Sequence, residues 1–149
     1  MAPRTGDDHG SSTGPGRLPV GGGGGSEGSE SSGGEAYTRF QEGSRLLESG
    51  DSHAAVVALE RARELEPEKG SIREALARAY FRSGRFHQAR EEFRKVVELD
   101  PVNDYAHFGL GLCLLRTGDR DGARGHLKLA TIMRPEAEAY QDALRQASA

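Results

Sequence analysis

Three prolines, Pro67, Pro101 and Pro135, follow one another along the chain at intervals of 34 residues. Proline has no amide hydrogen and its ring clashes with the preceding helical turn, so each of them marks a point where a helix stops. Five further columns superimpose at the same period: Gly50, Gly84 and Gly118; Leu46, Tyr80 and Leu114; Ala55, Ala89 and Ala123; Leu59, Phe93 and Leu127; and Ala62, Val96 and Ala130. A fixed period of this length predicts that one small structural unit is stacked several times.

Each unit has the pattern of two helices. In the middle unit the apolar positions 72, 76, 79 and 80 form the stripe of an amphipathic helix, and Gly84 follows it where a left-handed residue closes a helix. A second helix is predicted from Phe86 to about Leu99, ahead of Pro101. Ser71 and Asp104 are the expected N-caps of the first helices of the second and third units.

These residues resemble the tetratricopeptide repeat, a helix–turn–helix unit of 34 residues. The third unit fits the family pattern at Leu110, Gly111, Leu114, Ala123, Leu127, Ala130 and Pro135. The second unit fits it at Leu76, Ala77, Tyr80, Ala89, Phe93, Val96 and Pro101, whereas Glu42 takes the place of the first apolar residue in the first unit. The resemblance implies an all-α, right-handed solenoid with repeats at residues 36–69, 70–103 and 104–137.

The last segment, residues 136–148, is predicted to be a capping helix. Ala137, Tyr140, Leu144 and Ala147 lie on one apolar stripe, and the opposite face is polar. A solenoid needs such a helix because the last repeat otherwise leaves an apolar face open. Seven helices are therefore expected, and Tyr140 and Leu144 should pack against the second helix of the third repeat.

Residues 1–35 are predicted to be a disordered tail. Twelve of the 21 glycines fall within residues 1–34, which contain one Leu, one Val and no aromatic residue. Such a segment buries too little apolar surface to offset the entropy of ordering. The rest of the chain is neutral, with 18 basic and 18 acidic residues, so neither a nucleic-acid nor a membrane partner is expected. The lack of an apolar leader and the single Cys113 favour a cytoplasmic protein.

The sequence carries no recognisable catalytic, metal or cofactor site. His53 and His87 occupy equivalent repeat positions, but stacked helices lie ~8–10 Å apart, which is too far for two ligands of one ion. Cys113 lies in the apolar stretch GLGLCLL and is expected to be an unreactive core residue. We therefore expect no enzyme activity and no cofactor.

The family resemblance implies a concave groove lined by the first helix of each repeat. The groove residues that it implies, and that we select as the candidate partner-binding site, are Tyr37, Phe40, Arg78, Phe81, Arg82, Tyr105, Phe108, Leu112 and Arg116. Arg side chains and aromatic rings are common energetic anchors of recognition surfaces. The alternative is that the arginines pair with Glu48 and Glu74 and only solvate the groove.

The predicted function is non-catalytic binding of a protein or peptide segment in this groove. One subgroup of the family clamps the terminal carboxylate of chaperones with Lys and Asn, but the corresponding positions here are Phe40, Ser44, Ala75, Tyr105 and Gly109. The competing hypothesis is self-association, in which the apolar third repeat or the uncapped first helix buries itself in another copy. The partner's identity does not follow from the sequence.

Overall fold

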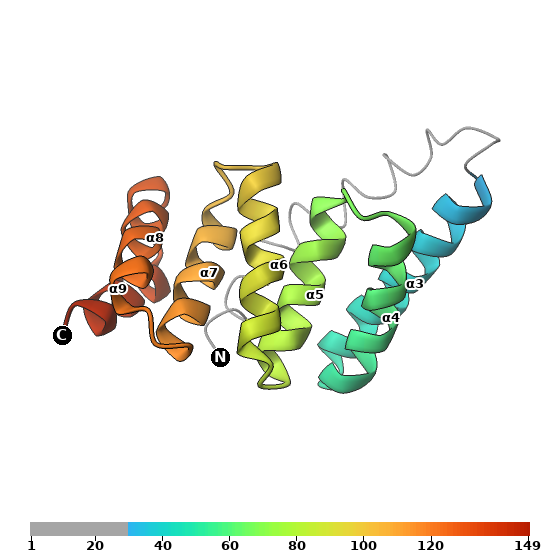
Figure 1. The fold of residues 1–149 in the computed structure, drawn as a ribbon, viewed down its shortest axis with the longest axis horizontal. Coiled ribbons are helices and arrows are strands. Elements are labelled where there is room, and N and C mark those ends of the chain that lie inside the picture. The colour runs from blue at the N-terminus through green and yellow to red at the C-terminus, as the bar shows by residue number, and fades with distance from the viewer. Residues whose placement is uncertain (1–29) are drawn as a thin grey trace.

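Residues 30–149 are described by the structure, a computed structural model, and they contain seven helices and no strand. The helices are α3 (Glu30–Glu48), α4 (Ser52–Leu65), α5 (Gly70–Arg82), α6 (Phe86–Leu99), α7 (Asp104–Arg116), α8 (Arg120–Met133) and α9 (Glu138–Ser148). They follow one another in chain order from one end of the molecule to the other (Figure 1). The all-α solenoid predicted from the 34-residue period is confirmed.

The repeating columns form the core of the solenoid. The alanine column and the large apolar column are completely buried, and they consist of Ala55, Ala89 and Ala123 and of Leu59, Phe93 and Leu127. The small residues let the two helices of a pair approach closely, and each buried large side chain contributes about 1.5–3 kcal/mol. The repeated residues of the sequence are therefore the residues that hold each helix pair together.

The turns are built as the period predicts. Gly50, Gly84 and Gly118 have φ angles of +92°, +83° and +95°, a left-handed region that favours glycine, and each lies just after the first helix of its pair. The repeat-ending prolines lie one residue beyond C-cap residues such as Asp100.

The expected N-caps of α5 and α7 are wrong. The cap of α7 is Asn103, whose side chain accepts a hydrogen bond from the amide of Ala106, while Asp104 already lies in the first turn. The N-cap of α5 is Lys69, which makes no side-chain cap, and Ser71 lies inside the helix. The proline-containing turns are thus one or two residues shorter than the sequence suggested.

α3 begins at Glu30, so the predicted tail boundary at residue 35 lies inside a helix. Glu35 accepts a hydrogen bond of 2.9 Å from Arg61 Nε on α4, and Ala36 is buried, so this part of α3 packs on the neighbouring helix. The predicted disorder of residues 1–29 lies outside the described residues.

A buried carboxylate joins the first two repeats. Glu92 of α6 accepts hydrogen bonds from Arg63 of α4 and from Arg73 of α5, the latter at 2.9 Å. A carboxylate that is removed from water needs such partners, because an unpaired buried charge is strongly destabilising. The three helices are therefore tied together by charge as well as by apolar packing.

Candidate protein-binding face

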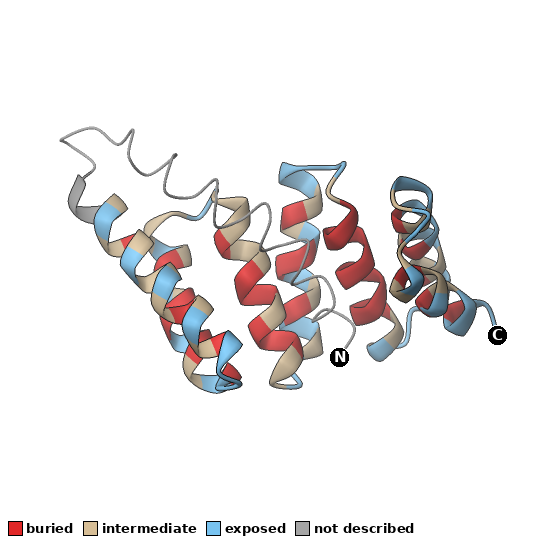
Figure 2. Ribbon diagram, turned by 180° about the vertical axis from the view of Figure 1, so that it is seen from behind, coloured by how far each residue is buried: buried red, intermediate tan, exposed pale blue. Residues whose placement is uncertain are grey.

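The first helices of the repeats, α3, α5 and α7, lie side by side, and we call the face that they form the first-helix row. α3 contacts α5, α5 contacts α7, and α7 contacts α9. Figure 2 shows the row from behind, with α7 almost entirely buried and α3 mostly half-buried or exposed. All nine candidate residues come from these three helices.

The nine residues divide by burial. Tyr37, Phe40, Arg78 and Arg82 are half-buried, and Arg116 is exposed. The remaining four are buried, and they are Phe81, Tyr105, Phe108 and Leu112. Only the four half-buried residues and the exposed Arg116 offer side-chain surface on this face.

The buried aromatic residues of α7 belong to a chain of ring contacts. Tyr105 meets the ring of Phe93 on α6 edge-on at 6.1 Å, and it lies 6.2 Å from Phe108. Phe108 in turn stacks on Tyr140 of α9, with the ring centroids 4.5 Å apart. The capping helix therefore packs on α7 as well as on α8, and Tyr140, which was expected to pack against the second helix of the third repeat, also stacks on the first.

Arg82 and Arg116, which are one repeat apart, each reach back to the preceding repeat. The Arg82 guanidinium donates a 3.0 Å hydrogen bond to the carbonyl of Leu47, near the end of α3. The Arg116 guanidinium lies 5.3 Å from the ring centroid of Phe81 and 4.9 Å from that of Phe86. Both arginines therefore help to join neighbouring repeats, a role that neither sequence interpretation foresaw.

Two family models described as tetratricopeptide repeat match residues 46–101 and 74–138. The chain belongs to the tetratricopeptide repeat family.

A curated relative and two solved structures agree with this membership. The chain is 34% identical over 85 residues to the TPR repeat-containing thioredoxin TTL4 of Arabidopsis thaliana. The matched segment covers 57% of this chain but only 12% of that protein. The fold is similar to the first TPR of Spaghetti (RPAP3) bound to an HSP90 peptide, with a TM-score of 0.73, 18% identity, and coverage of 76% of this chain and 90% of that one. It is also similar to the second TPR domain of human RPAP3 in complex with an HSP70 peptide, with a TM-score of 0.72, 15% identity, and coverage of 77% and 96%.

The two histidines at equivalent repeat positions are not the pair that the structure brings together. His53 and His87 are exposed near the starts of α4 and α6. The pair that meets is His107 of α7 and His126 of α8, whose Nδ1 atoms are 3.0 Å apart. These two residues face each other across one helix pair, and only the register of that pair, set by the turn at Gly118, could have revealed the contact.

The side chains that the structure describes, residues 33–149, contain no cluster of three or more His, Cys, Asp or Glu that could hold a metal ion. Burial raises the pKa of the Cys113 thiol to about 12, so this residue is protonated at neutral pH. Among the helices of residues 30–149, none has the length and apolar character needed to cross a bilayer.

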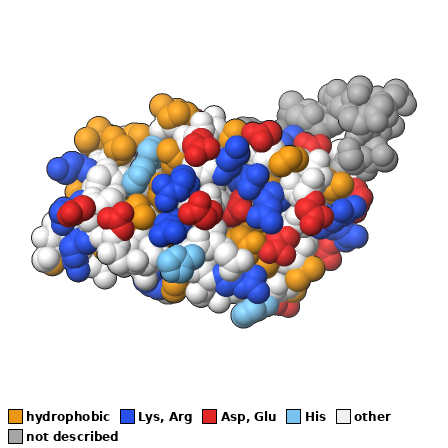
Figure 3. Space-filling view, viewed as in Figure 1, with side chains coloured by type: hydrophobic (Ala, Val, Ile, Leu, Met, Phe, Trp, Pro, Cys, Tyr) orange, Lys and Arg blue, Asp and Glu red, His pale blue; other side chains and the backbone are white. Residues whose placement is uncertain are grey.

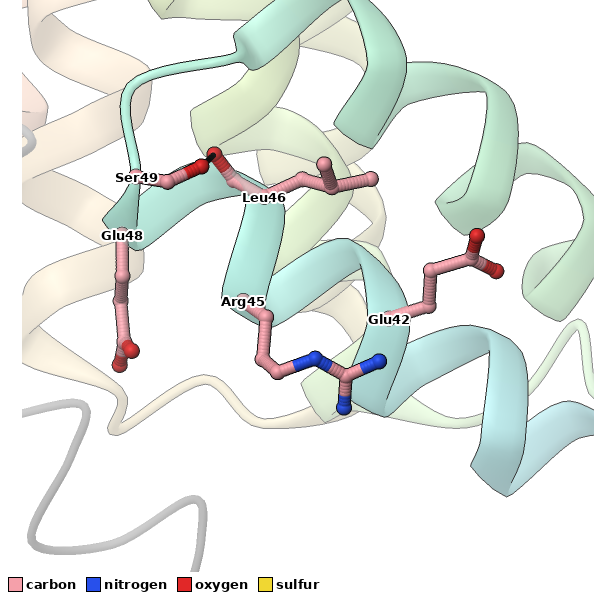
Figure 4. A pocket seen from close by; sticks show the side chains of 5 residues that line it. All are labelled: Glu42, Arg45, Leu46, Glu48 and Ser49. Atoms are coloured by element: carbon pink, nitrogen blue, oxygen red, sulfur yellow. Dashed lines mark hydrogen bonds between the residues drawn. The ribbon is translucent and has the colours of Figure 1, made fainter.

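A shallow pocket lies at the C-terminal end of α3, away from the nine candidate residues. It has a volume of about 650 Å³ and is lined by Glu42, Arg45, Leu46, Glu48 and Ser49 (Figure 4). The Ser49 hydroxyl is already used, because it donates to the carbonyl of Leu46. The mixture of charges and the single apolar side chain give this pocket no clear chemical preference.

Proposed function

We propose that this chain is a non-catalytic protein-binding module whose contact face is the accessible part of the first-helix row. The observation that carries the proposal is the row itself, in which three tetratricopeptide repeats present their first helices side by side. Peptides are bound by two proteins of similar fold, the first and second TPR domains of RPAP3.

The accessible residues suggest what kind of segment would bind. Tyr37 and Phe40 offer half-buried aromatic surface at one end of the row, and Arg78 offers a guanidinium in its middle. We propose that a partner segment places an apolar side chain on Tyr37 and Phe40 and an acidic group beside Arg78. Phe81, Tyr105, Phe108 and Leu112 would then support the face from beneath, and Arg82 and Arg116 would border it.

A chaperone-type terminal carboxylate is a poor match for this face. The positions that would clamp it carry Phe40, Ser44, Ala75, Tyr105 and Gly109, and none of these residues is Lys or Asn. Without cationic or amide donors at those positions, a terminal carboxylate would lose its charge-assisted hydrogen bonds. We therefore propose an internal segment of a protein as the ligand.

The test is selection of binding peptides from a random display library, followed by affinity measurement with fluorescence polarisation. Arg78→Ala should weaken the selected peptides at least about tenfold, which corresponds to about 1.4 kcal/mol. Arg94→Ala, on the exposed side of α6, is the matched control and should leave the affinity unchanged. Circular dichroism of both variants checks that the helices remain intact.

Three results would oppose the proposal. No enrichment of peptides would argue against a binding face, and an equal effect of Arg78→Ala and Arg94→Ala would move the contact away from the first-helix row. Tight binding of the HSP90 peptide SRMEEVD would contradict the choice of an internal segment.

A further inference from the structure

An apolar patch is exposed on the opposite side of the molecule from the first-helix row. Its members, which we call the α8 patch, are Leu129, Ile132 and Met133 of α8 and Leu99 and Val102 beside the α6–α7 turn. Ile132 and Val102 are 68% and 77% exposed. Figure 3, viewed as Figure 1, shows hydrophobic side chains over the upper end of α8 and, close by, over the α6–α7 turn. Such a contiguous patch is typical of an interaction surface.

Comparison of the repeats within the chain shows that two members of the patch, Leu129 and Ile132, are apolar only in the third repeat. The positions that precede Leu129 by one and two periods are Lys95 and Arg61, and those that precede Ile132 are Glu98 and Glu64. The outer surface of the fold is therefore compatible with charges at both positions. Leu129, Ile132 and Met133 do not belong to the buried core, unlike Ala123, Leu127 and Ala130 of the same helix.

Gly125 adds an independent observation. It is exposed in the middle of α8, and no atom lies within 4 Å of the position where its Cβ would stand. A Cβ at Gly43, Gly109 or Gly111 would instead overlap a neighbouring side chain, which explains those glycines. Glycine destabilises a helix interior relative to alanine, and no neighbouring atom of the described chain accounts for a glycine at position 125.

We propose that the α8 patch binds a second copy of this chain, with the two α8 helices antiparallel across a two-fold axis. Gly125 and Ile132 are seven residues apart, which is two helical turns, so they lie on the same side of α8. In this arrangement Ile132 of each copy packs on the exposed backbone at Gly125 of the other, where no side chain or neighbouring atom occupies the space. A two-fold interface needs such self-complementarity, since the same residues meet in both directions.

The remaining residues of the surface fit the same arrangement. Leu129 lies close to the two-fold axis, and Lys128 on its flank has a long aliphatic stem that can line the contact while its ammonium stays in water. One helix and one turn per copy make a small interface, so the dimer is weak and forms as the concentration rises. The first-helix row remains accessible in the dimer, because the patch is built from α8 and the α6–α7 turn.

This assignment narrows the self-association hypothesis to the second helix of the third repeat. α7, which is apolar nearly all round, packs within its own chain against α5, α6, α8 and α9. The outer side of α8, which has no such cover in the described chain, takes its place as the contact.

Sedimentation velocity of the full chain, from low micromolar to several hundred micromolar, tests the proposal. The wild-type chain should shift from monomer towards dimer, and Ile132→Glu should remain monomeric throughout. This substitution introduces the residue already present at positions 64 and 98, so the repeat tolerates it. Val57→Glu is the matched control, because Val57 is 70% exposed on α4 and lies outside the patch; it should dimerise like the wild type.

A cysteine cross-link tests the geometry. Leu129→Cys should form an intermolecular disulfide under mild oxidation, because the two residues meet near the axis, whereas Val57→Cys should not. The native Cys113 is buried and gives no background. A wild-type chain that stays monomeric at every concentration would overturn the proposal, and so would a dimer that Ile132→Glu leaves intact or that Leu129→Cys fails to cross-link.

Discussion

The second and third repeats have helices of equal length but place their polar residues very differently. α5 and α7 are both 13 residues long, and α6 and α8 are both 14. α5 alternates buried alanines with half-buried charged residues, including Arg73 and Arg78, whereas every residue of α7 from Asp104 to Leu114 is buried. The outer helices differ in the same direction, since Lys95 and Glu98 of α6 correspond to Leu129 and Ile132 of α8.

This difference separates the core residues, which are the same kind in both repeats, from the surface residues, which differ between them. Both repeats keep the same small and large core residues, Ala89 and Phe93 in one and Ala123 and Leu127 in the other, and all four are completely buried. Because these columns suffice for the helix pair, the other positions are free to change. In the third repeat, apolar residues occupy these positions on both α7 and α8. The stability of this repeat therefore depends more on the helices that cover it.

The largest expected effect comes from removing the cover of the third repeat. Truncation after Pro135 deletes α9 and with it Tyr140, Ala143 and Ala147, which are all buried. Loss of the Tyr140 ring from Phe108 alone removes about 1.5–3 kcal/mol of apolar burial. We expect the third repeat to lose amide hydrogen-exchange protection, while α4 and α5 keep most of theirs, since repeats contact mainly their neighbours.

A single substitution refines this prediction. Tyr140→Phe keeps the ring but removes the 2.7 Å hydrogen bond that the hydroxyl donates to the buried Asp104. Arg134 also donates to Asp104, so this carboxylate keeps a partner, and the loss in unfolding free energy should be about 1 kcal/mol. Equal exchange rates in the truncated and complete chains would contradict the role of α9 as a cap.

An effect smaller than that of the truncation is expected at Gly109, whose equivalent in the second repeat is Ala75. A Cβ at Gly109 would overlap the ring of Phe93, whereas the residue one period before Phe93 is the smaller Leu59. Gly109→Ala should lower the unfolding free energy by about 1–2 kcal/mol, because overpacking outweighs the better helix propensity of alanine. Chemical denaturation at low protein concentration measures it.

The control is the same substitution in open space. Gly125→Ala meets no atom within 4 Å, so it should stabilise the monomer by about 0.5–1 kcal/mol. If both substitutions change stability in the same direction, local packing does not explain why α7 contains glycine where α5 contains alanine.

The 34-residue period predicted the helix pairs and the turn glycines with positive φ, because these depend on residues that repeat, and the apolar stripe after Pro135 predicted the capping helix. The burial of Tyr105 and Phe108 was not predicted, since the free side of a first helix depends on how successive repeats rotate and on where α9 packs. The α8 patch was also missed, although the charged columns ending at Leu129 and Ile132 were visible in the sequence. A search for repeated residues passes over the positions at which the repeats differ, and in this chain those positions determine which part of the surface is apolar.

The smallest expected effect concerns the histidine pair, which the second repeat lacks because Arg73 and Glu92 occupy the corresponding positions. The second nitrogen of His107, Nε2, lies 2.8 Å from the carbonyl of Pro101, an acceptor only. Nε2 must therefore carry a proton, so in the neutral pair Nδ1 of His107 accepts from Nδ1 of His126. Burial, followed by His107 and Arg94 of α6, lowers the pKa of His126, while Asp119 opposes the shift.

Acid should therefore destabilise the third repeat through His126. Because its pKa is lower in the folded state, the unfolded chain binds more protons below about pH 6.5, and stability should fall as the pH decreases through that value. His126→Asn keeps a donor for His107 and cannot titrate, so its unfolding free energy should depend less on pH between about 5 and 7. His87→Asn, at an exposed site on α6, is the control and should retain the wild-type pH dependence. Denaturant unfolding across this pH range measures the effect. If the unfolding free energy changes with pH equally in the wild type and in His126→Asn, the histidine pair does not cause an acid sensitivity that distinguishes the third repeat from the second.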